Sequence, residues 1–354
     1  MKTNQVVLVT GVADYWGARV ANRLLHEEGV RVLGVDTAVP DKIPDGLDFI
    51  QADVRNPLLT DLLRAEQVDT VCHLAFTDSR RRSEQNFDLN VMGTIKVFGA
   101  CADAGVRKVV HRSSTAVYGA NPINPAFLTE SHPLHGSRRY GNTRDMVEIE
   151  EFCDGFRQQA PDILLTTLRF ANIVGHTAKT ALNTLLQGRV APMLLGFDPM
   201  MQIIHEDDVV EALVYAIVQD VPGIFNVAAE GLMPFSRILT MTGTIPVPLL
   251  HPLAYWGANA LWGTRLNPAR YIPVDLDYLR YRWVADTTKM QTDMGFCPQY
   301  TAEEALREFV GRKRRQPYEE SVDALTYDEA RLRDTLERRR RQKERFAAIE
   351  KGQE

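Results

Sequence analysis

The stretch Val6–Gly17 constrains the fold of this 354-residue chain more than any other part of it. A short apolar run leads into Thr10-Gly11, and a second glycine follows at Gly17. Residues 18–25 then have the spacing of an amphipathic helix. This order predicts a buried strand, a tight turn and a helix N-terminus whose N–H groups and dipole can hold a phosphate. Because the turn comes so early, we expect no targeting segment before it.

Strand-like and helix-like segments continue to alternate beyond this turn. Apolar runs typical of buried strands occur at 31–36, 50–55, 68–75 and 106–114, and 91–104 has helical spacing. The alternation predicts an α/β fold, a Rossmann-like doubly wound parallel sheet, with a smaller C-terminal substrate-binding lobe. The second run ends at Asp36, where a carboxylate would bind the adenosine ribose and repel a 2′-phosphate. We therefore predict NAD rather than NADP.

Composition excludes several classes of protein. The chain is 45% hydrophobic and 25% charged, as expected for a soluble globular protein, and its net charge of -5 gives no reason to expect a nucleic-acid partner. Its four cysteines are scattered, without the spacing of a disulfide framework or a zinc site. We expect a cytoplasmic, reducing location.

Three regions are expected along the chain. Residues 1–175 would form the nucleotide-binding domain, and 176–310 mostly a substrate-binding lobe, with elements near 203–228 returning to the first domain. Residues 311–354 are rich in charge and poor in apolar side chains, which predicts a solvated helical tail with acid–base pairs along it. Contact of this tail with anionic lipid or a partner is the alternative.

Eight short blocks match a known family in the family's order. They are Thr10-Gly11 with Gly17, Ala52–Arg55, His73–Ala75, Asn90–Thr94, Ser113–Gly119, Tyr140–Arg144, Leu168–Asn172 and His205–Asp208. On these blocks the chain resembles the extended short-chain dehydrogenase/reductases, and among them the NAD-dependent epimerases and dehydratases that act on nucleotide sugars. UDP-glucose 4-epimerase-like proteins are the most similar group. The resemblance covers about residues 6 to 310.

The resemblance implies three catalytic residues. Tyr140 would exchange a proton with a substrate hydroxyl while hydride passes to or from nicotinamide, and Ser114 would hydrogen-bond the same oxygen. The family has Lys four residues after the Tyr, where it lowers the pKa of the phenol and holds the nicotinamide ribose. Here that position is Arg144, which keeps the positive charge but is a planar fork rather than a compact ammonium.

The resemblance also implies ligand-binding residues. For the cofactor they are Gly11, Asp14, Tyr15, Trp16, Gly17, Asp36, Asp53, Val54, Leu74, Ala75, Phe76 and Asn90, with Tyr140 and Arg144. For the substrate they are Arg80, Thr115 and Asn172. Arg80 belongs to a run of three arginines that could hold a phosphate or carboxylate, or be a solvated helix end. The block His205–Asp208 would join the two lobes, and we expect no metal.

Two further departures from the family concern its ligands. Asp14 replaces the middle glycine, so its carboxylate would repel the cofactor's pyrophosphate unless it turns away or meets a cation such as Arg19. The arginines that hold the diphosphate of a nucleotide sugar have no clean match in 199–204 or near 279–283. The nucleotide-sugar site is therefore incomplete by sequence.

The apolar segment 247–262 has three interpretations. Prolines and His251 interrupt it, so it cannot span a membrane. It could be ordinary core, the wall of an apolar pocket, or a membrane-surface contact, and core is the commonest of these.

Three functions remain open. They are a family enzyme acting on a hydroxyl or keto group, a reductase or isomerase of a hydrophobic or lipid-linked alcohol or ketone, and an NAD-binding regulatory or scaffold protein that has lost catalysis. We expect a small-molecule substrate and a homodimer formed through the helices at about 90–104 and 140–158.

Overall fold

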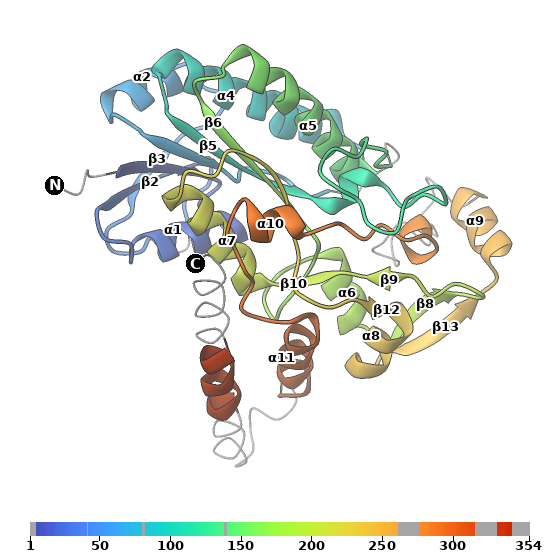
Figure 1. The fold of residues 1–354 in the computed structure, drawn as a ribbon. Coiled ribbons are helices and arrows are strands. Elements are labelled where there is room, and N and C mark those ends of the chain that lie inside the picture. The colour runs from blue at the N-terminus through green and yellow to red at the C-terminus, as the bar shows by residue number, and fades with distance from the viewer. Residues whose placement is uncertain are drawn as a thin grey trace.

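The computed structural model describes residues 5–40, 42–79, 82–137, 140–260, 276–315 and 331–341, without the side chains of 257–260 and 314–315. Its centre is a seven-stranded parallel sheet of order β11-β6-β5-β4-β1-β2-β3 (Figure 1). These strands are β1 Gln5–Thr10, β2 Val30–Asp36, β3 Asp48–Gln51, β4 Thr70–His73, β5 Lys108–Ser114, β6 Leu164–Phe170 and β11 Gly223–Val227.

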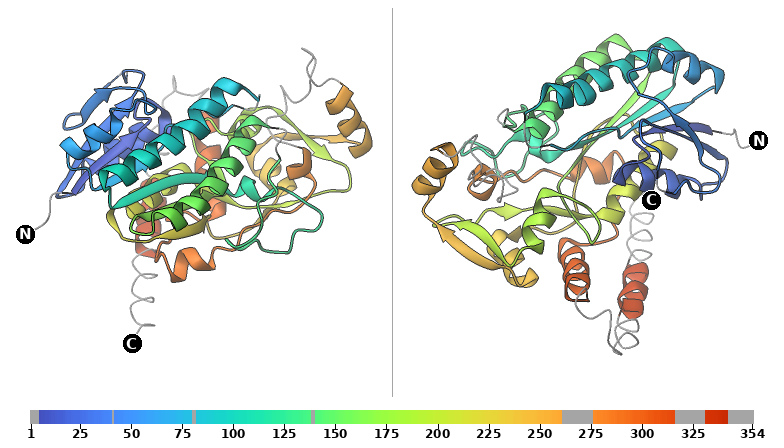
Figure 2. Two further views of the ribbon diagram at one scale, coloured as in Figure 1. Left: turned by 90° about the horizontal axis from the view of Figure 1, so that it is seen from above. Right: turned by 180° about the vertical axis from the view of Figure 1, so that it is seen from behind.

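Helices cover both faces of this sheet (Figures 1 and 2). One face carries α1 Tyr15–Leu24 and α7 Glu206–Val218, and the other carries α2 Leu59–Ala65, α4 Gly93–Ala104 and α5 Gly141–Gln159. Side chains of β1 alternate between the two layers: Val7 and Val9 pack on the α1 side and Leu8 on the α4 side. The predicted doubly wound α/β fold is confirmed.

A smaller lobe has its own apolar core. It contains the parallel pairs β7–β10 and β8–β13, the antiparallel pair β9–β12, and helices α6, α8, α9 and α11. Their bounds are β7 Asn172–Val174, α6 Ala181–Gln187, β8 Val190–Leu194, β9 Met200–Met201, β10 Ile203–His205, β12 Met233–Pro234, α8 Phe235–Thr242, β13 Ile245–Leu249, α9 His251–Ala260 and α11 Ala302–Arg315. Two short helices complete the description: α3 Glu84–Phe87 lies between β4 and α4 in sequence, and α10 Thr288–Thr292 precedes α11 and contacts β11 of the large sheet.

One predicted boundary is wrong: helix α1 begins at Tyr15 rather than near residue 18. Strand β3 ends at Gln51, shortly before Asp53, whose carboxylate accepts the Arg55 backbone N–H and turns the chain. The predicted helix 91–104 is helical throughout, with a π-helical turn over Asp88–Met92 that leads into α4 at Gly93.

The commonest interpretation of segment 247–262, ordinary core, is wrong for its outer face. Leu250, Leu253 and Trp256 are 56%, 62% and 71% exposed, whereas Ala254 and Tyr255 pack on the lobe's core. The two prolines of β13 lie in a strand pair with β8, and α9 follows directly, so only one side of this segment meets the lobe. No helix in the described ranges is long and apolar enough to cross a bilayer.

The charged tail does not begin as a solvated segment at residue 311. Helix α11 continues through Arg315, and Lys313 Nζ donates to the carbonyls of Leu186 (2.6 Å) and Thr242 (3.2 Å). Residues 331–341 are helical, as predicted, and Arg341 pairs with Glu337 one turn earlier.

Candidate active site

In doubly wound folds the ligand binds where the strand order reverses, and in this sheet that point lies between β1 and β4. The glycine turn after β1 lies at this point. Gly11 has φ +76, and a Cβ there would lie 2.8 Å from the Ala75 backbone nitrogen. A Cβ on Gly17 would lie 2.0 Å from the Gly11 carbonyl oxygen. Both positions therefore require glycine, and the turn has the tight strand-to-helix geometry that fits a dinucleotide pyrophosphate.

Asp14 fits the turn without the glycine that the family has there. Its φ is -87, so the backbone needs no left-handed conformation, and its side chain is exposed and caps no N–H group of α1. Although the Asp14 residue is exposed at its surface, desolvation by the surrounding turn raises the pKa of its carboxyl, and the nearby Asp36 carboxylate adds to the rise. Asp36 accepts the backbone N–H of Ala13 (2.9 Å) and of Ala38 (3.0 Å), so it supports the turn from the end of β2.

The loop after β4 closes onto the turn through Thr10. Its Oγ1 accepts the N–H groups of Leu74 (3.1 Å) and Ala75 (3.2 Å) and lies 2.9 Å from His73 Nδ1. With both N–H groups accepted, Thr10 donates its own proton to Nδ1, which leaves His73 Nε2 as the donor to Thr94 Oγ1 at 3.0 Å. Burial lowers the pKa of His73 to about 3. His73 is thus a neutral structural side chain.

Asn90 joins three elements rather than presenting a free amide. Its Oδ1 accepts the Thr77 N–H (2.8 Å), and its Nδ2 donates to the Thr77 carbonyl (3.1 Å) and to Asp145 Oδ2 (2.9 Å). The π-helical turn places this carboxamide between the β4 loop and α5.

Asp53 and Val54 lie at the outer end of the crevice. The Asp53 carboxylate binds the guanidinium of Arg55, with 2.6 Å from Nη2 to Oδ2, and these hydrogen bonds lower the pKa of the Asp53 carboxyl. Val54 is buried in the α4-side core. The structure therefore pairs Asp53 with a neighbour in sequence, and its predicted contact with the cofactor stays a prediction.

The two central catalytic candidates come from adjacent elements. Ser114 ends β5, and its Oγ accepts the Ala116 N–H (3.2 Å) at the start of the 3-10 helix Thr115–Tyr118, while its hydroxyl proton remains available to donate. Tyr140 is the N-cap of α5, and the next residues are fixed by Asn142, whose Nδ2 donates to Asp78 Oδ1 at 2.9 Å.

Apolar packing brings these two elements together. Val117 of the 3-10 helix shares a cluster with Met146 and Val147 of α5, and Phe76 and Leu134 pack against it. The predicted cofactor residue Phe76 thus lies beside the start of α5.

Arg144 is held by a carboxylate that the sequence analysis did not consider. Its Nε and Nη2 donate to Asp145 Oδ1 at 2.9 and 2.7 Å, and its guanidinium covers the Phe87 ring, 4.7 Å from Cζ to centroid. Asp145 is 1% exposed. The cation at this position is therefore neutralised by its neighbour in sequence and stacked on an aromatic ring.

The three predicted substrate residues are not gathered in one described cluster. Arg80 lies outside the described residues. Thr115 is buried in the 3-10 helix, and Asn172 Nδ2 donates to the Gln202 carbonyl at 3.0 Å. Their contact with a substrate stays a prediction.

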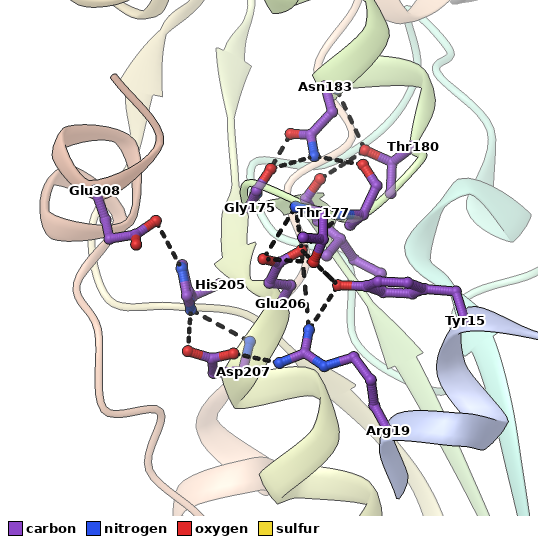
Figure 3. A network of polar contacts seen from close by, with 12 residues as sticks. Tyr15, Arg19, Gly175, Thr177, Thr180, Asn183, His205, Glu206, Asp207 and Glu308 are labelled. Carbon is purple, nitrogen blue, oxygen red and sulfur yellow. Dashed lines mark hydrogen bonds and ion pairs between the residues drawn. The ribbon is translucent and has the colours of Figure 1, made fainter. Parts of the chain in front are cut away.

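Tyr15 connects the glycine turn to the smaller lobe (Figure 3). Its hydroxyl donates to Glu206 Oε2 at 2.6 Å and lies 2.7 Å from Thr177 Oγ1. Burial, followed by the Glu206 hydrogen bond, raises the pKa of Tyr15 to about 12. Arg19 donates to the Tyr15 hydroxyl (2.6 Å) and pairs with Asp207, so it is engaged here rather than neutralising Asp14.

Sequence reasoning missed two further features of this region. A buried ion pair joins Arg169 of β6 to Glu150 of α5, with 2.7 Å from Nη2 to Oε2. Arg280 lies over the rings of Phe197 (4.9 Å) and Tyr281 (4.7 Å) in the smaller lobe. The charge of Arg169 inside the apolar strand β6 was the only sequence signal for the first. Arg280 lies in the stretch 279–283, which was considered only as a place for an arginine that binds diphosphate.

Comparison with known proteins agrees with this geometry. The model of the family described as "NAD dependent epimerase/dehydratase family" matches residues 7–228. The chain is 34% identical over 320 residues to protein Rv0501 of Mycobacterium tuberculosis, covering 86% of this chain and 83% of that protein. It is 31% identical over 231 residues to a UDP-glucose 4-epimerase of Mycolicibacterium smegmatis, covering 59% of this chain and 72% of that enzyme.

Solved structures share the fold at low sequence identity. The UDP-glucose 4-epimerase of Thermotoga maritima in complex with UDP-glucose superposes with a TM-score of 0.66 at 20% identity, covering 89% of this chain and all of that one. The UDP-glucuronic acid 4-epimerase of Bacillus cereus, in complex with UDP-glucuronic acid and NAD, gives 0.68 at 18%, covering 88% and all of that chain. This chain belongs to the NAD dependent epimerase/dehydratase family, whose cofactor is the one predicted from Asp36.

Proposed function

We propose that the protein is an NAD-dependent oxidoreductase of this family that acts on a hydroxyl or keto group of a nucleotide sugar. The observation that carries the proposal is the packing around the loop after β4. The glycine turn lies against Ala75, and the next residue, Phe76, packs against Val117 and Met146. Val117 lies three residues after Ser114, and Met146 lies in the helix that begins after Tyr140, which supports a shared site. The nucleotide-sugar epimerases among the relatives support the substrate class.

Bound NAD supplies a group that accepts and returns hydride. In the proposed reaction Tyr140 removes the proton of the substrate hydroxyl and later returns it, while Ser114 donates a hydrogen bond to the same oxygen. Arg144 stands four residues after Tyr140, where the family has Lys, and its guanidinium is paired with Asp145.

The test is turnover of UDP-glucose, UDP-galactose and UDP-glucuronic acid with added NAD, followed by NMR detection of the epimer. We expect Tyr140→Phe to abolish turnover while the variant still binds NAD, as calorimetry would show. Arg144→Lys is the matched control, because it keeps the positive charge and has the residue that the family has at this position. Turnover that survives Tyr140→Phe would refute the mechanism.

A second candidate function has its own observation. The outer face of α9 exposes Leu253 and Trp256, and no arginine lies in residues 199–204 to hold a diphosphate. These features favour a hydrophobic or lipid-linked alcohol or ketone as the substrate of a reductase or isomerase, with a membrane-surface contact through α9. Tight binding of UDP-sugars with no response to acyl or sterol-like compounds would count against it.

The third candidate is a regulatory or scaffold protein that binds NAD without catalysis. The ion pair between Arg144 and Asp145 favours it, because a guanidinium paired with Asp145 is less available for the role that the family's Lys has. Arg144→Lys would then gain turnover that the parent protein lacks. Hydride transfer catalysed by the parent protein would exclude this function.

A further inference from the structure

Arg112 extends from β5 toward the start of α1, and β4 lies between β5 and β1 in the sheet. Its guanidinium lies over the indole ring of Trp16, with 5.6 Å between Cζ and the ring centroid. Trp16 is the second residue of α1, directly behind the turn. The cation is therefore held at the helix N-terminus where the pyrophosphate of a dinucleotide binds in this fold.

The strand alternation fixes the direction of this side chain. Val110 packs with Val9 and Cys72 on the α1 side of the sheet, and the Trp16 ring packs against the same cluster. Arg112 follows two residues after Val110, so it projects from the same face, one position nearer the crevice. The contact with Trp16 agrees with this placement.

Arg112 differs from the other arginines of the crevice in its partners. Arg19 is bound to Asp207 and Tyr15, and Arg144 to Asp145. Across the part of the chain that the structure describes, no hydrogen bond or ion pair holds the Arg112 guanidinium. Burial lowers its pKa, and the charge of Asp78 opposes that shift. A partly buried guanidinium to which no carboxylate is hydrogen-bonded is costly, so an anionic ligand here would be strongly favoured.

The turn also carries a negative charge that needs compensation. Asp14 brings a carboxylate to the N-terminus of α1, and Arg19 is turned away from it. We propose that Arg112 binds the pyrophosphate of the dinucleotide and offsets the charge of Asp14. This inference rests on the proposed function, because it takes a dinucleotide as the ligand.

Calorimetric titration of the cofactor-free protein tests the inference. The parent protein, Arg112→Ala and Arg107→Ala would each be titrated with NAD, NADH and ADP-ribose. Arg107 is the matched control, because it precedes the same strand but pairs with Asp69 and Asp220 at the far end of the sheet. We expect Arg112→Ala to weaken all three ligands by the same factor, about tenfold or more, and Arg107→Ala to leave them unchanged.

The choice of ligands separates the possible outcomes. A contact with pyrophosphate affects NAD, NADH and ADP-ribose alike, whereas a contact with nicotinamide would spare ADP-ribose and would overturn the inference. If the parent protein binds NAD and Arg112→Ala binds it equally tightly or more tightly, this inference is refuted and the proposed function is not. Absence of NAD binding by the parent protein would refute the proposed function and this inference with it.

Two more variants keep the test independent of folding. If Arg112→Ala does not fold, Arg112→Gln keeps a long polar side chain without the charge and is expected to show the same loss. Adding Asp14→Gly to Arg112→Ala removes the carboxylate as well, and we expect it to recover part of the lost affinity. No recovery would overturn the role of Arg112 in offsetting Asp14.

Discussion

The buried pair Arg169–Glu150 makes a strong prediction about stability. The two side chains are 2% and 0% exposed, and Glu150 also accepts a hydrogen bond from Ser113 Oγ at 2.6 Å. Glu150→Ala would leave the Arg169 guanidinium buried without its carboxylate. We expect a loss of about 3–5 kcal/mol in the free energy of unfolding, the usual cost of leaving one member of a buried pair uncompensated.

The geometry supports this magnitude. Arg169 donates to Glu150 through Nε (2.9 Å) and Nη2 (2.7 Å), and each hydrogen bond to a charged group contributes about 1.5–3 kcal/mol. The remaining contacts of Arg169, to the Tyr118 hydroxyl (2.7 Å) and the Glu130 carbonyl (3.0 Å), are neutral and cannot replace the lost charge.

Urea unfolding at pH 7, followed by circular dichroism, measures this loss. The exposed neighbour Glu151→Ala is the control, with an expected change within about 0.5 kcal/mol. Replacing both members of the pair by Met leaves no charge buried, so it should cost less than Glu150→Ala alone. A cost below about 1 kcal/mol for Glu150→Ala, or a double variant as unstable as the single one, would refute the reasoning.

Four other predictions follow from the structure. Burial lowers the pKa of His111 to about 3, and neither ring nitrogen has a hydrogen-bond partner among the described residues. Below about pH 6.5 the unfolded state therefore binds a proton that the folded state does not bind. Between pH 7.5 and pH 5 this difference lowers the free energy of unfolding by about 2 kcal/mol. His111→Phe should remove that share of the acid destabilisation in thermal melts, and an unchanged pH profile would contradict the assignment. Asp36→Asn should narrow the preference for NAD over NADP in calorimetry, since the charge that repels a 2′-phosphate is gone; an unaltered ratio would exclude Asp36 as the discriminator. Leu253→Asp combined with Trp256→Asp should reduce co-sedimentation with anionic lipid vesicles, and equal sedimentation of parent and variant would exclude a membrane contact through α9. Light scattering should give twice the mass of the chain, and a monomeric mass would refute the predicted dimer.

The fold was predictable because its signals are local. The apolar run of β1 and the two glycines that follow depend only on backbone geometry and burial, and sequence spacing reports both directly. Ser114 and Tyr140 came instead from the resemblance of short blocks to a known family, and their catalytic roles stay predictions.

The partners of the site residues were not predictable in the same way. Tyr15 meets Glu206 across a sequence separation of 191 residues, and Asn90 meets Asp145 across 55. Such contacts depend on how the lobes and helices pack, which no local pattern records. For α9, the apolar content was clear but the layer that it covers was not, so the sequence could not separate core from a surface contact.

The hydrogen bonds of Tyr15 have a thermodynamic consequence. Glu206 accepts from the Tyr15 hydroxyl and also from the N–H of Ala178 (2.6 Å), so one carboxylate holds both the glycine turn and the loop that follows β7. A ligand that moves this loop must also strain or break the bond to Tyr15. Linkage is reciprocal. If such a ligand changes the affinity for the dinucleotide by some factor, the dinucleotide changes the affinity for that ligand by the same factor. The two binding events are thereby coupled through a single side chain.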